Sequence, residues 1–123
     1  GGKITSFEPK TTFHAVDYND TDFIAHQAMP SGSYVDLTLG VSGVLYKAPA
    51  DGYVCFEKMG GAINLYIQIT DISSGATVIS RAADSSGNMS VVLPISKGRN
   101  YQINYNATGS TTLFRFIYAN GAK

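Results

Sequence analysis

The stretch LYKAPADGYVCF, residues 45–56, places two strand-forming runs on either side of Pro49-Ala50-Asp51-Gly52. Proline fixes φ near the value that the first central position of a β-turn requires, and Asp-Gly pairs are frequent in such turns. The Tyr, Val and Phe residues of the flanking runs pack well on a pleated surface. We therefore predict two strands joined by a short turn, both in the same sheet.

Alternation of apolar and polar residues, the period of a strand with one buried face, recurs downstream. The more apolar residues stand at odd positions in residues 63–70 and again in residues 101–106. The residues between them are Asn64, Tyr66, Gln68 and Thr70 in the first run and Gln102, Asn104 and Asn106 in the second. Further strands are expected at Tyr34–Leu39, Val44–Lys47, Tyr53–Lys58, Thr77–Arg81, Met89–Leu93 and Leu113–Tyr118.

Turn residues such as Ser42-Gly43 and Lys97-Gly98 separate these runs at short intervals. Many short strands with such spacing are typical of an all-β, antiparallel sandwich, including the jelly roll. No segment shows the period of an amphipathic helix. Residues 1–33 are less regular and are expected to be a lead-in, an edge strand or a stalk junction. Residues 34–123 are expected to form the head domain.

The composition limits the classes of function. The chain has 123 residues, about the length of one domain, and its 9 basic residues balance its 9 acidic ones. Nucleic acids and anionic membranes attract basic proteins, so we expect neither as a partner. We also expect no membrane span, which needs roughly 20 apolar residues, and no signal segment. Only 15% of the residues are charged, which favours burial of surface in an oligomer.

The run LFRFIYA, residues 113–119, is apolar on both faces. Three aromatic residues share one face, and Leu113, Arg115 and Ile117 share the other. A strand that faces solvent on one side is normally polar there, so we expect a second subunit to cover this strand. A buried Arg115 would need a carboxylate or carbonyl partner. Three copies of it around a threefold axis could instead hold a small anion.

Three segments together resemble known proteins. LYKAPADGYVCFEK (45–58), VVLPISKGRNYQINYN (91–106) and FRFIYA (114–119) resemble successive strand and turn elements of the complement globular-head family. The chain looks more closely like C-terminal domains of bacteriophage and prophage tail fibres and tail needles in the segments YVDLTLGVSGVLYKAPADGYV, LPISKGRNYQINY and FRFIYANGA. Arg99-Asn100 departs from the family, which commonly has an acidic residue after Lys-Gly.

This resemblance implies a tumour-necrosis-factor-like jelly roll that forms a homotrimer. In virions such a trimer caps a fibre or needle and meets the host surface. We therefore expect a non-catalytic virion domain at the phage tail tip, assembled in the host cytoplasm, that binds a glycan or protein receptor on bacteria. Two alternatives stay open: a purely structural trimerisation or head-fibre cap without a receptor, and a monomeric carbohydrate-binding module.

The polar rows and loops supply the candidate receptor contacts. Planar amides form hydrogen bonds with sugars, and aromatic rings stack on the apolar faces of sugars. Exposed strand faces are, however, normally polar whether or not they bind a ligand. The candidate contact loops are Asp71–Gly75, Asp84–Asn88 and Asn106–Thr111. The candidate receptor-binding residues are Asn64, Tyr66, Gln68, Asp84, Asn88, Asn106 and Thr108. The candidate trimer-interface residues, of which the aromatic ones are equally expected in the core, are Tyr101, Tyr105, Phe114, Arg115, Phe116 and Tyr118.

The sequence favours neither a metal site nor a cofactor. DYNDTD, residues 17–22, has oxygen ligands at alternate positions, but Asp22 stands where an EF-hand requires glycine. The single Cys55 excludes an intramolecular disulfide and a multi-cysteine zinc site. A thiol nucleophile would need Cys55 beside His14 or His26, whereas its place in a strand is typical of a buried, inert residue.

Hydrolytic catalysis is equally poorly supported by the sequence. There is no Gly-x-Ser-x-Gly pattern of a serine hydrolase. Glycoside cleavage would need two carboxylates that face one cleft. The acidic residues of the β region are Asp36, Asp51, Glu57, Asp71 and Asp84. They stand mostly near turns, so we expect no enzyme.

Overall fold

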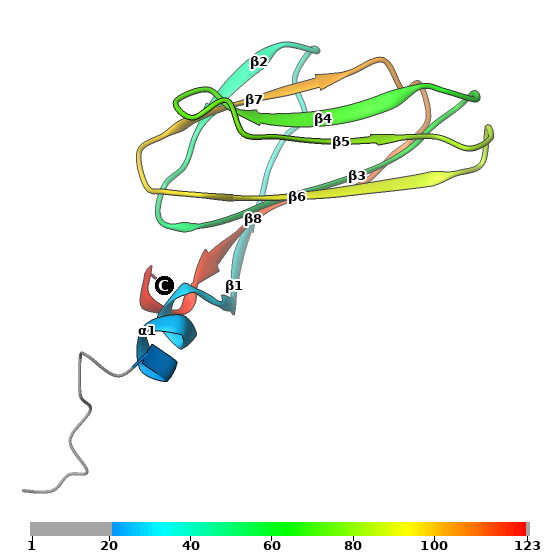
Figure 1. Ribbon diagram of the computed structural model, residues 1–123. Coiled ribbons are helices and arrows are strands. Elements are labelled where there is room, and N and C mark those ends of the chain that lie inside the picture. Colours follow the sequence, from blue (N-terminus) through cyan, green and yellow to red (C-terminus); the bar gives the residue numbers. More distant parts are fainter. Residues whose placement is uncertain (1–20, 123) are drawn as a thin grey trace, which may run out of the picture.

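The computed structural model describes residues 21–122, which fold as two four-stranded β-sheets with a short helix at one end (Figure 1). Sheet I has the strand order β1-β8-β3-β6 and sheet II the order β2-β7-β4-β5, and neighbouring strands are antiparallel. This confirms the prediction of an all-β antiparallel sandwich. In chain order the elements are α1 (Thr21–Ala28), β1 (Pro30–Asp36), β2 (Val44–Lys47), β3 (Gly52–Met59), β4 (Tyr66–Asp71), β5 (Thr77–Arg81), β6 (Asn88–Ile95), β7 (Asn100–Tyr105), β8 (Thr111–Ala119) and η1 (Asn120–Ala122).

Helix α1 was missing from the sequence prediction. Its eight residues make little more than two turns, which is too short for a helical period to stand out. Pro30 cannot continue the helix and begins strand β1 instead. The side chain of Asn120 donates a hydrogen bond to the carbonyl oxygen of His26 at 2.9 Å, and its backbone N–H donates to Met29 at 2.8 Å. The helix is therefore held by the end of the chain.

Residues 48–51 carry the chain from one sheet to the other. Strand β2 pairs with β7 in sheet II, whereas β3 pairs with β6 and β8 in sheet I, so the prediction that both strands share a sheet was wrong. The carboxylate of Asp51 accepts a hydrogen bond from the backbone N–H of Lys97 at 2.8 Å. A Cβ atom at Gly52 would meet the carbonyl oxygen of Ile117 and the ring of Phe116. Glycine is required here because β8 passes so closely.

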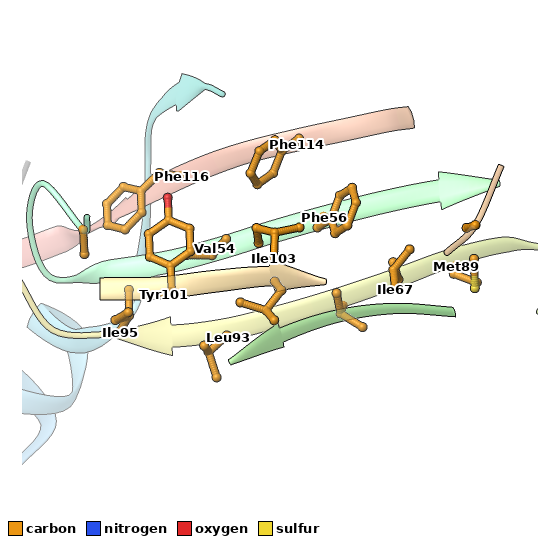
Figure 2. Close-up of a cluster of buried hydrophobic side chains, with 14 of the residues drawn as sticks. Val54, Phe56, Ile67, Met89, Leu93, Ile95, Tyr101, Ile103, Phe114 and Phe116 are labelled. Carbon is orange, nitrogen blue, oxygen red and sulfur yellow. The ribbon is translucent and has the colours of Figure 1, made fainter. Parts of the chain in front are cut away.

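The core fills the space between the two sheets, as Figure 2 shows. Phe56 and Phe116 of sheet I face Tyr101 and Ile103 of sheet II, and each of the four is at most 1% exposed. Burying an apolar side chain of this size stabilises a fold by about 1.5–3 kcal/mol. The ring of Tyr101 also stacks on that of Tyr46, with centroids 5.4 Å apart. These contacts hold the two sheets together and fix which faces remain outside.

The two ends of the sandwich carry different segments (Figure 1). Helix α1 and η1 lie together at one end, which we call the near end, with the turns at residues 48–51, 72–76 and 96–99. The opposite or far end carries the loops at residues 60–65, 82–87 and 106–110. The first and the last described elements, α1 and η1, therefore lie at the end opposite these three loops.

Backbone hydrogen bonds tie the far-end loops to one another. Gly60 donates to Gly87 at 2.9 Å, and Gly61 donates to Ser85 at 3.1 Å. Thr108 donates to Gly60 at 3.0 Å. The three loops therefore form one hydrogen-bonded surface.

Candidate functional site

Two rows of polar side chains lie next to each other on the outer face of sheet II. Gln68 of β4 stands opposite Asn104 of β7, and Thr70 stands opposite Gln102. Tyr66 continues the β4 row toward the far end. These five residues, here called the amide face, are all half-buried, because their strand neighbours Ile67, Ile69 and Ile103 take the inner positions. The sequence predicted each row but not that the two rows are adjacent.

Two side chains of the amide face use their amide nitrogen for hydrogen bonds within the chain. Gln68 donates from Nε2 to Thr70 Oγ1 at 3.2 Å, and Gln102 donates from Nε2 to the carbonyl oxygen of Gly43 at 3.0 Å. Asn104 Oδ1 is buried, and no residue in the described part of the chain donates to it. A covered amide oxygen without a donor costs a fold about 1–3 kcal/mol. The covered oxygen of Asn104 is out of reach of an external partner, so Gln68 and Gln102 are the amide side chains that this face offers for polar contacts.

Apolar and cationic side chains border the amide face. Leu45 of β2 is 55% exposed beside Gln102, and Ile79 of β5 is 48% exposed beside Gln68. The guanidinium carbon of Arg81 lies 5.5 Å from the centre of the Tyr66 ring. The centre of the face is thus uncharged, and its border offers apolar surface.

The far end gathers the other candidate receptor residues around its loops. Asn64 was expected in a strand, but its φ angle of 68° places it in the turn before β4. Asn106 Oδ1 accepts a hydrogen bond from the Tyr66 N–H at 2.7 Å, so this side chain fixes the end of the amide face. Thr108 bonds to Gly60 through its backbone N–H. Asn64, Asn106 and Thr108 therefore border the amide face at the far end.

Asp84 and Asn88 flank the loop between β5 and β6. The carboxylate of Asp84 accepts hydrogen bonds from the N–H and the hydroxyl of Ser86, both at 3.0 Å, which closes a local turn. Asn88 Oδ1 accepts a hydrogen bond from the Thr112 hydroxyl at 3.1 Å. Both side chains are exposed and have structural partners within the chain. The loop Asp71–Gly75, also a candidate, lies instead at the near end.

Three of the aromatic trimer-interface candidates lie in the core, which is the other place expected for them. Tyr101, Phe114 and Phe116 are at most 5% exposed within one chain, so they have no surface left for a second subunit. Tyr105 and Tyr118 are partly buried and pack against the same core. Alternation along β8 turns the aromatic residues inward, so Arg115 is the one candidate on an outer face.

The outer face of sheet I is largely apolar. Along one row, Tyr34 of β1, Ile117 of β8, Tyr53 of β3 and Pro94 of β6 stand side by side. The next row holds Asp36, Arg115, Cys55 and Val92. Tyr34 is 52% exposed and Val92 47%, which is unusual for a solvated sheet face. We call these eight residues the apolar face.

Arg115 is the charged centre of the apolar face. Its Nε lies 3.3 Å from Asp36 Oδ1, and its guanidinium carbon lies 4.0 Å from the centre of the Tyr34 ring. Nε is buried and makes no well-directed hydrogen bond to a described residue, so the Asp36 contact is an ion pair of poor geometry. Cys55 stands directly beside Arg115 across the strand pair, and burial of its thiol is the main cause that raises its pKa.

The near end has a hollow of ≈ 590 Å³. Thirteen residues line it, and the charged ones are Asp51, Asp71 and Arg99. Burial would raise the pKa of Asp71, but hydrogen bonds from Arg99, Ser74 and Ser73 outweigh it and lower the pKa overall. A general acid in glycoside cleavage needs a raised pKa, so Asp71 does not suit that role.

Other sequence candidates lie partly beyond the described residues. His14 and residues 17–20 of the acidic cluster are outside residues 21–122. Within residues 21–122, no group of three or more His, Cys, Asp or Glu is placed to hold a metal ion. The helices of that same range are too short and polar to cross a membrane.

Comparisons with known proteins add no assignment. None of the known protein families, curated proteins or solved structures matches this chain.

Proposed function

We propose that this chain is a trimerising tip domain of a bacteriophage or prophage tail fibre or tail needle, which binds a bacterial surface receptor without catalysing a reaction. The strand orders β1-β8-β3-β6 and β2-β7-β4-β5 support a jelly roll, in which two Greek keys form two facing sheets. The resemblance of three segments to such tips supports the same function. In the virion the domain would lie at the tail tip after assembly in the host cytoplasm.

The observation that carries the proposal is the apolar face of sheet I. Obligate interfaces between subunits resemble a protein core cut in half, whereas solvated sheet faces are normally polar. Tyr34 and Val92 are each about half exposed on this face. We infer that the apolar face forms the seam between three subunits. Arg115 would then be desolvated further, which a better-placed acceptor from a second subunit would offset.

The arrangement of the two ends supports a tip. Helix α1, the first described element, lies at the near end, so a fibre attached there would leave the far-end loops pointing away from it. Loops on a rigid scaffold are the usual place for recognition. Asn64, Asp84, Asn106 and Thr108 would then be among the first residues to reach a bacterial surface.

A second candidate function is a monomeric carbohydrate-binding module, which the amide face of sheet II favours. A third is a structural cap that trimerises without a receptor. The carbohydrate-binding module differs from our proposal in its mass, whereas the structural cap differs only in that it does not bind to cells. Two measurements therefore separate the three.

The first measurement is the mass of the purified chain by light scattering across a dilution series. A trimer of three 13.1 kDa chains is expected. Val92→Glu should dissociate it, because a charge in an apolar seam is costly. Ile79→Glu is the matched control, since Ile79 is 48% exposed on sheet II and Val92 47% on sheet I. A wild-type chain that stays monomeric at high concentration contradicts the trimeric tip.

The second measurement is binding of the labelled trimer to a panel of bacterial strains. The proposal predicts binding to some strains and not to others. A stable trimer that binds none of the strains would favour the structural cap. Binding by a stable monomer would favour the carbohydrate-binding module.

A further inference from the structure

The side chain of Lys58 lies between the two sheets at the far end and is only 8% exposed. Its Nζ atom donates hydrogen bonds to the carbonyl oxygen of Gly109 at 2.6 Å and to Thr111 Oγ1 at 3.4 Å. Nζ also lies 5.3 Å from the centre of the Tyr105 ring. No carboxylate within residues 21–122 forms an ion pair with it. In the described part of the chain, the charge is therefore buried among neutral partners.

A buried ammonium group without a carboxylate is unfavourable for the stability of a fold. Removing the charge from water costs free energy, and hydrogen bonds to neutral groups offset that cost only in part. Lysine usually buries its stem and keeps its charged head in water, whereas here the head is covered as well. Methionine would fill a similar volume without a charge. Packing of the core alone therefore does not account for Lys58.

The carbonyl that Lys58 binds belongs to the far-end loop at residues 106–110. The outer side of this loop exposes Asn106 and Thr108, two of the candidate receptor residues. Its inner side turns the carbonyl oxygen of Gly109 toward Lys58. The buried lysine thus holds the back of a loop whose front carries candidate contacts.

The same loop lies tightly against the end of β3. The Met59 N–H donates a hydrogen bond to the carbonyl oxygen of Ser110 at 2.8 Å. A Cβ atom at Gly109 would lie 2.5 Å from the Met59 carbonyl oxygen, so the two backbones are in close contact. The loop is therefore fixed on both sides of the bond that Lys58 makes.

A β-bulge at the start of β8 brings a hydroxyl group to Lys58. Lys58 stands opposite Thr111. The preceding Glu57 stands opposite Leu113, so Thr112 is left without a partner in β3. Bulges re-aim side chains and are frequent beside functional sites. The irregularity in the β3–β8 pair thus coincides with the buried charge.

We propose that Lys58 is a positioning residue for receptor binding, which holds the loop at residues 106–110 in the shape that the receptor recognises. This inference rests on the proposed function and adds an internal residue to the far-end surface. Lys58 itself is covered and would not touch the receptor. A loop that is fixed before binding loses less conformational entropy when it binds, which raises affinity. Residues that break a rule of stability are expected mainly at functional sites.

The test compares two lysine variants on a bacterial strain that the wild-type chain binds. Lys58→Met removes the ammonium group and both of its hydrogen bonds but keeps most of the side-chain volume. Binding should weaken about tenfold, because ordering the backbone of one residue changes a binding constant by roughly that factor. Lys47→Met is the matched control, since Lys47 is exposed on β2 and its loss removes the same charge. It should bind like wild type.

Hydrogen exchange of the unbound chain reports on the loop directly. In Lys58→Met the Gly109 carbonyl loses its donor and should turn toward water. The backbone amides of residues 106–111 should then exchange about tenfold faster, while those of β3 and β7 keep their rates. Lys47→Met should leave all of these rates unchanged. Unchanged loop rates in Lys58→Met would overturn the proposal.

Urea unfolding separates positioning from a purely structural role. Lys58→Met ends the burial of a charge, so it should unfold at the same urea concentration as wild type or a higher one. A residue that serves only the fold would show the opposite result. Loss of both stability and binding in Lys58→Met would therefore overturn the positioning role.

Cell binding also distinguishes this inference from the proposed function. Full binding by Lys58→Met, on a strain that wild type binds, would overturn the inference and leave the tip function standing. Failure of wild type to bind any strain would overturn the tip function and the inference with it. Weaker binding by a stable variant with a faster-exchanging loop is the expected result.

Discussion

Arg99 Nη1 lies 2.9 Å from Asp71 Oδ2, and this ion pair joins the β4–β5 turn to the β6–β7 turn at the near end. The Asp71 side chain is only 5% exposed, whereas that of Arg99 is 44% exposed. Asp71 also accepts hydrogen bonds from the Ser73 N–H and the Ser74 hydroxyl, both at 3.0 Å. Arg99 therefore compensates a buried carboxylate.

The first prediction concerns the pH dependence that this pair creates. The pKa of Asp71 is lowered on folding, so its carboxylate stabilises the fold above its unfolded pKa of about 3.9. That contribution is lost as the pH falls through the lower, folded pKa. Asp71→Asn should reduce the free energy of unfolding at pH 7 by about 1–3 kcal/mol.

Urea unfolding from pH 2.5 to 7 would check this prediction. The difference between wild type and Asp71→Asn should shrink once both proteins carry an uncharged group at position 71. Asp84→Asn serves as the control, because Asp84 is exposed and closes only a local turn. It should change the stability by less than about 0.5 kcal/mol. A difference for Asp71→Asn that stays constant with pH would contradict the prediction.

The second prediction concerns the face of β8 that builds the core. Phe116 is fully buried, whereas its neighbour Ile117 is partly exposed on the apolar face. Phe116→Ala should lower the free energy of unfolding by about 3–5 kcal/mol. Ile117→Ala should lower the free energy of unfolding of the monomer clearly less, and it should weaken the proposed trimer instead. Chemical unfolding and light scattering on the same two variants would check both statements, and equal losses of stability would be evidence against this face assignment.

The third prediction concerns the thiol of Cys55. Burial raises its pKa above the ordinary value, against the opposing effect of Arg115, so less thiolate is present at neutral pH. Alkylation by iodoacetamide should therefore be slower than that of glutathione. In the proposed trimer the apolar face would be covered, so labelling should accelerate on dilution and in the Val92→Glu variant. Mass spectrometry of timed samples measures the rate, and a rate independent of both changes would remove Cys55 from the seam.

The fourth prediction concerns the passage of β8 beside Gly52. Alanine at this position would force the β3–β8 pair apart, because its Cβ meets the Ile117 carbonyl oxygen and the Phe116 ring. Gly52→Ala should destabilise the fold by about 1–3 kcal/mol. Gly32→Ala is the control, since no atom lies within 4 Å of a Cβ built there. A thermal melt compares the two, and similar melting temperatures for both variants would mean that the strands can separate freely.

Alternation predicted the sandwich because each strand has one buried face. It could assign Ile67 and Ile103 to the inside and Gln68 and Asn104 to the outside without any tertiary information. It could not predict that β4 and β7 are neighbours, because pairing between strands distant in the sequence leaves no local signal. The two amide rows were therefore identified, but their union into one face was not.

The errors of sequence interpretation have the same origin. The turn after β2 looks like a hairpin because Pro49 and Gly52 are typical of one, yet the chain changes sheets there. Gly52 serves the close approach of β8, which lies more than sixty residues away in the sequence. The aromatic residues of β8 were expected in the core or at a subunit seam, because both faces of that strand are apolar. The pattern alone could not decide which apolar face turns inward.

The hydrogen bonds that join the three far-end loops also restrict how this surface can diversify. Inserting residues into the loop at 60–65 would pull Gly60 and Gly61 away from partners in both other loops. Length changes at one loop would therefore disturb all three, while side-chain exchange would leave the backbone intact. Under the proposed function, host range would evolve by substitution within loops of fixed length. Libraries made to retarget the domain should randomise side chains such as Asp84 and Thr108 and keep loop lengths constant.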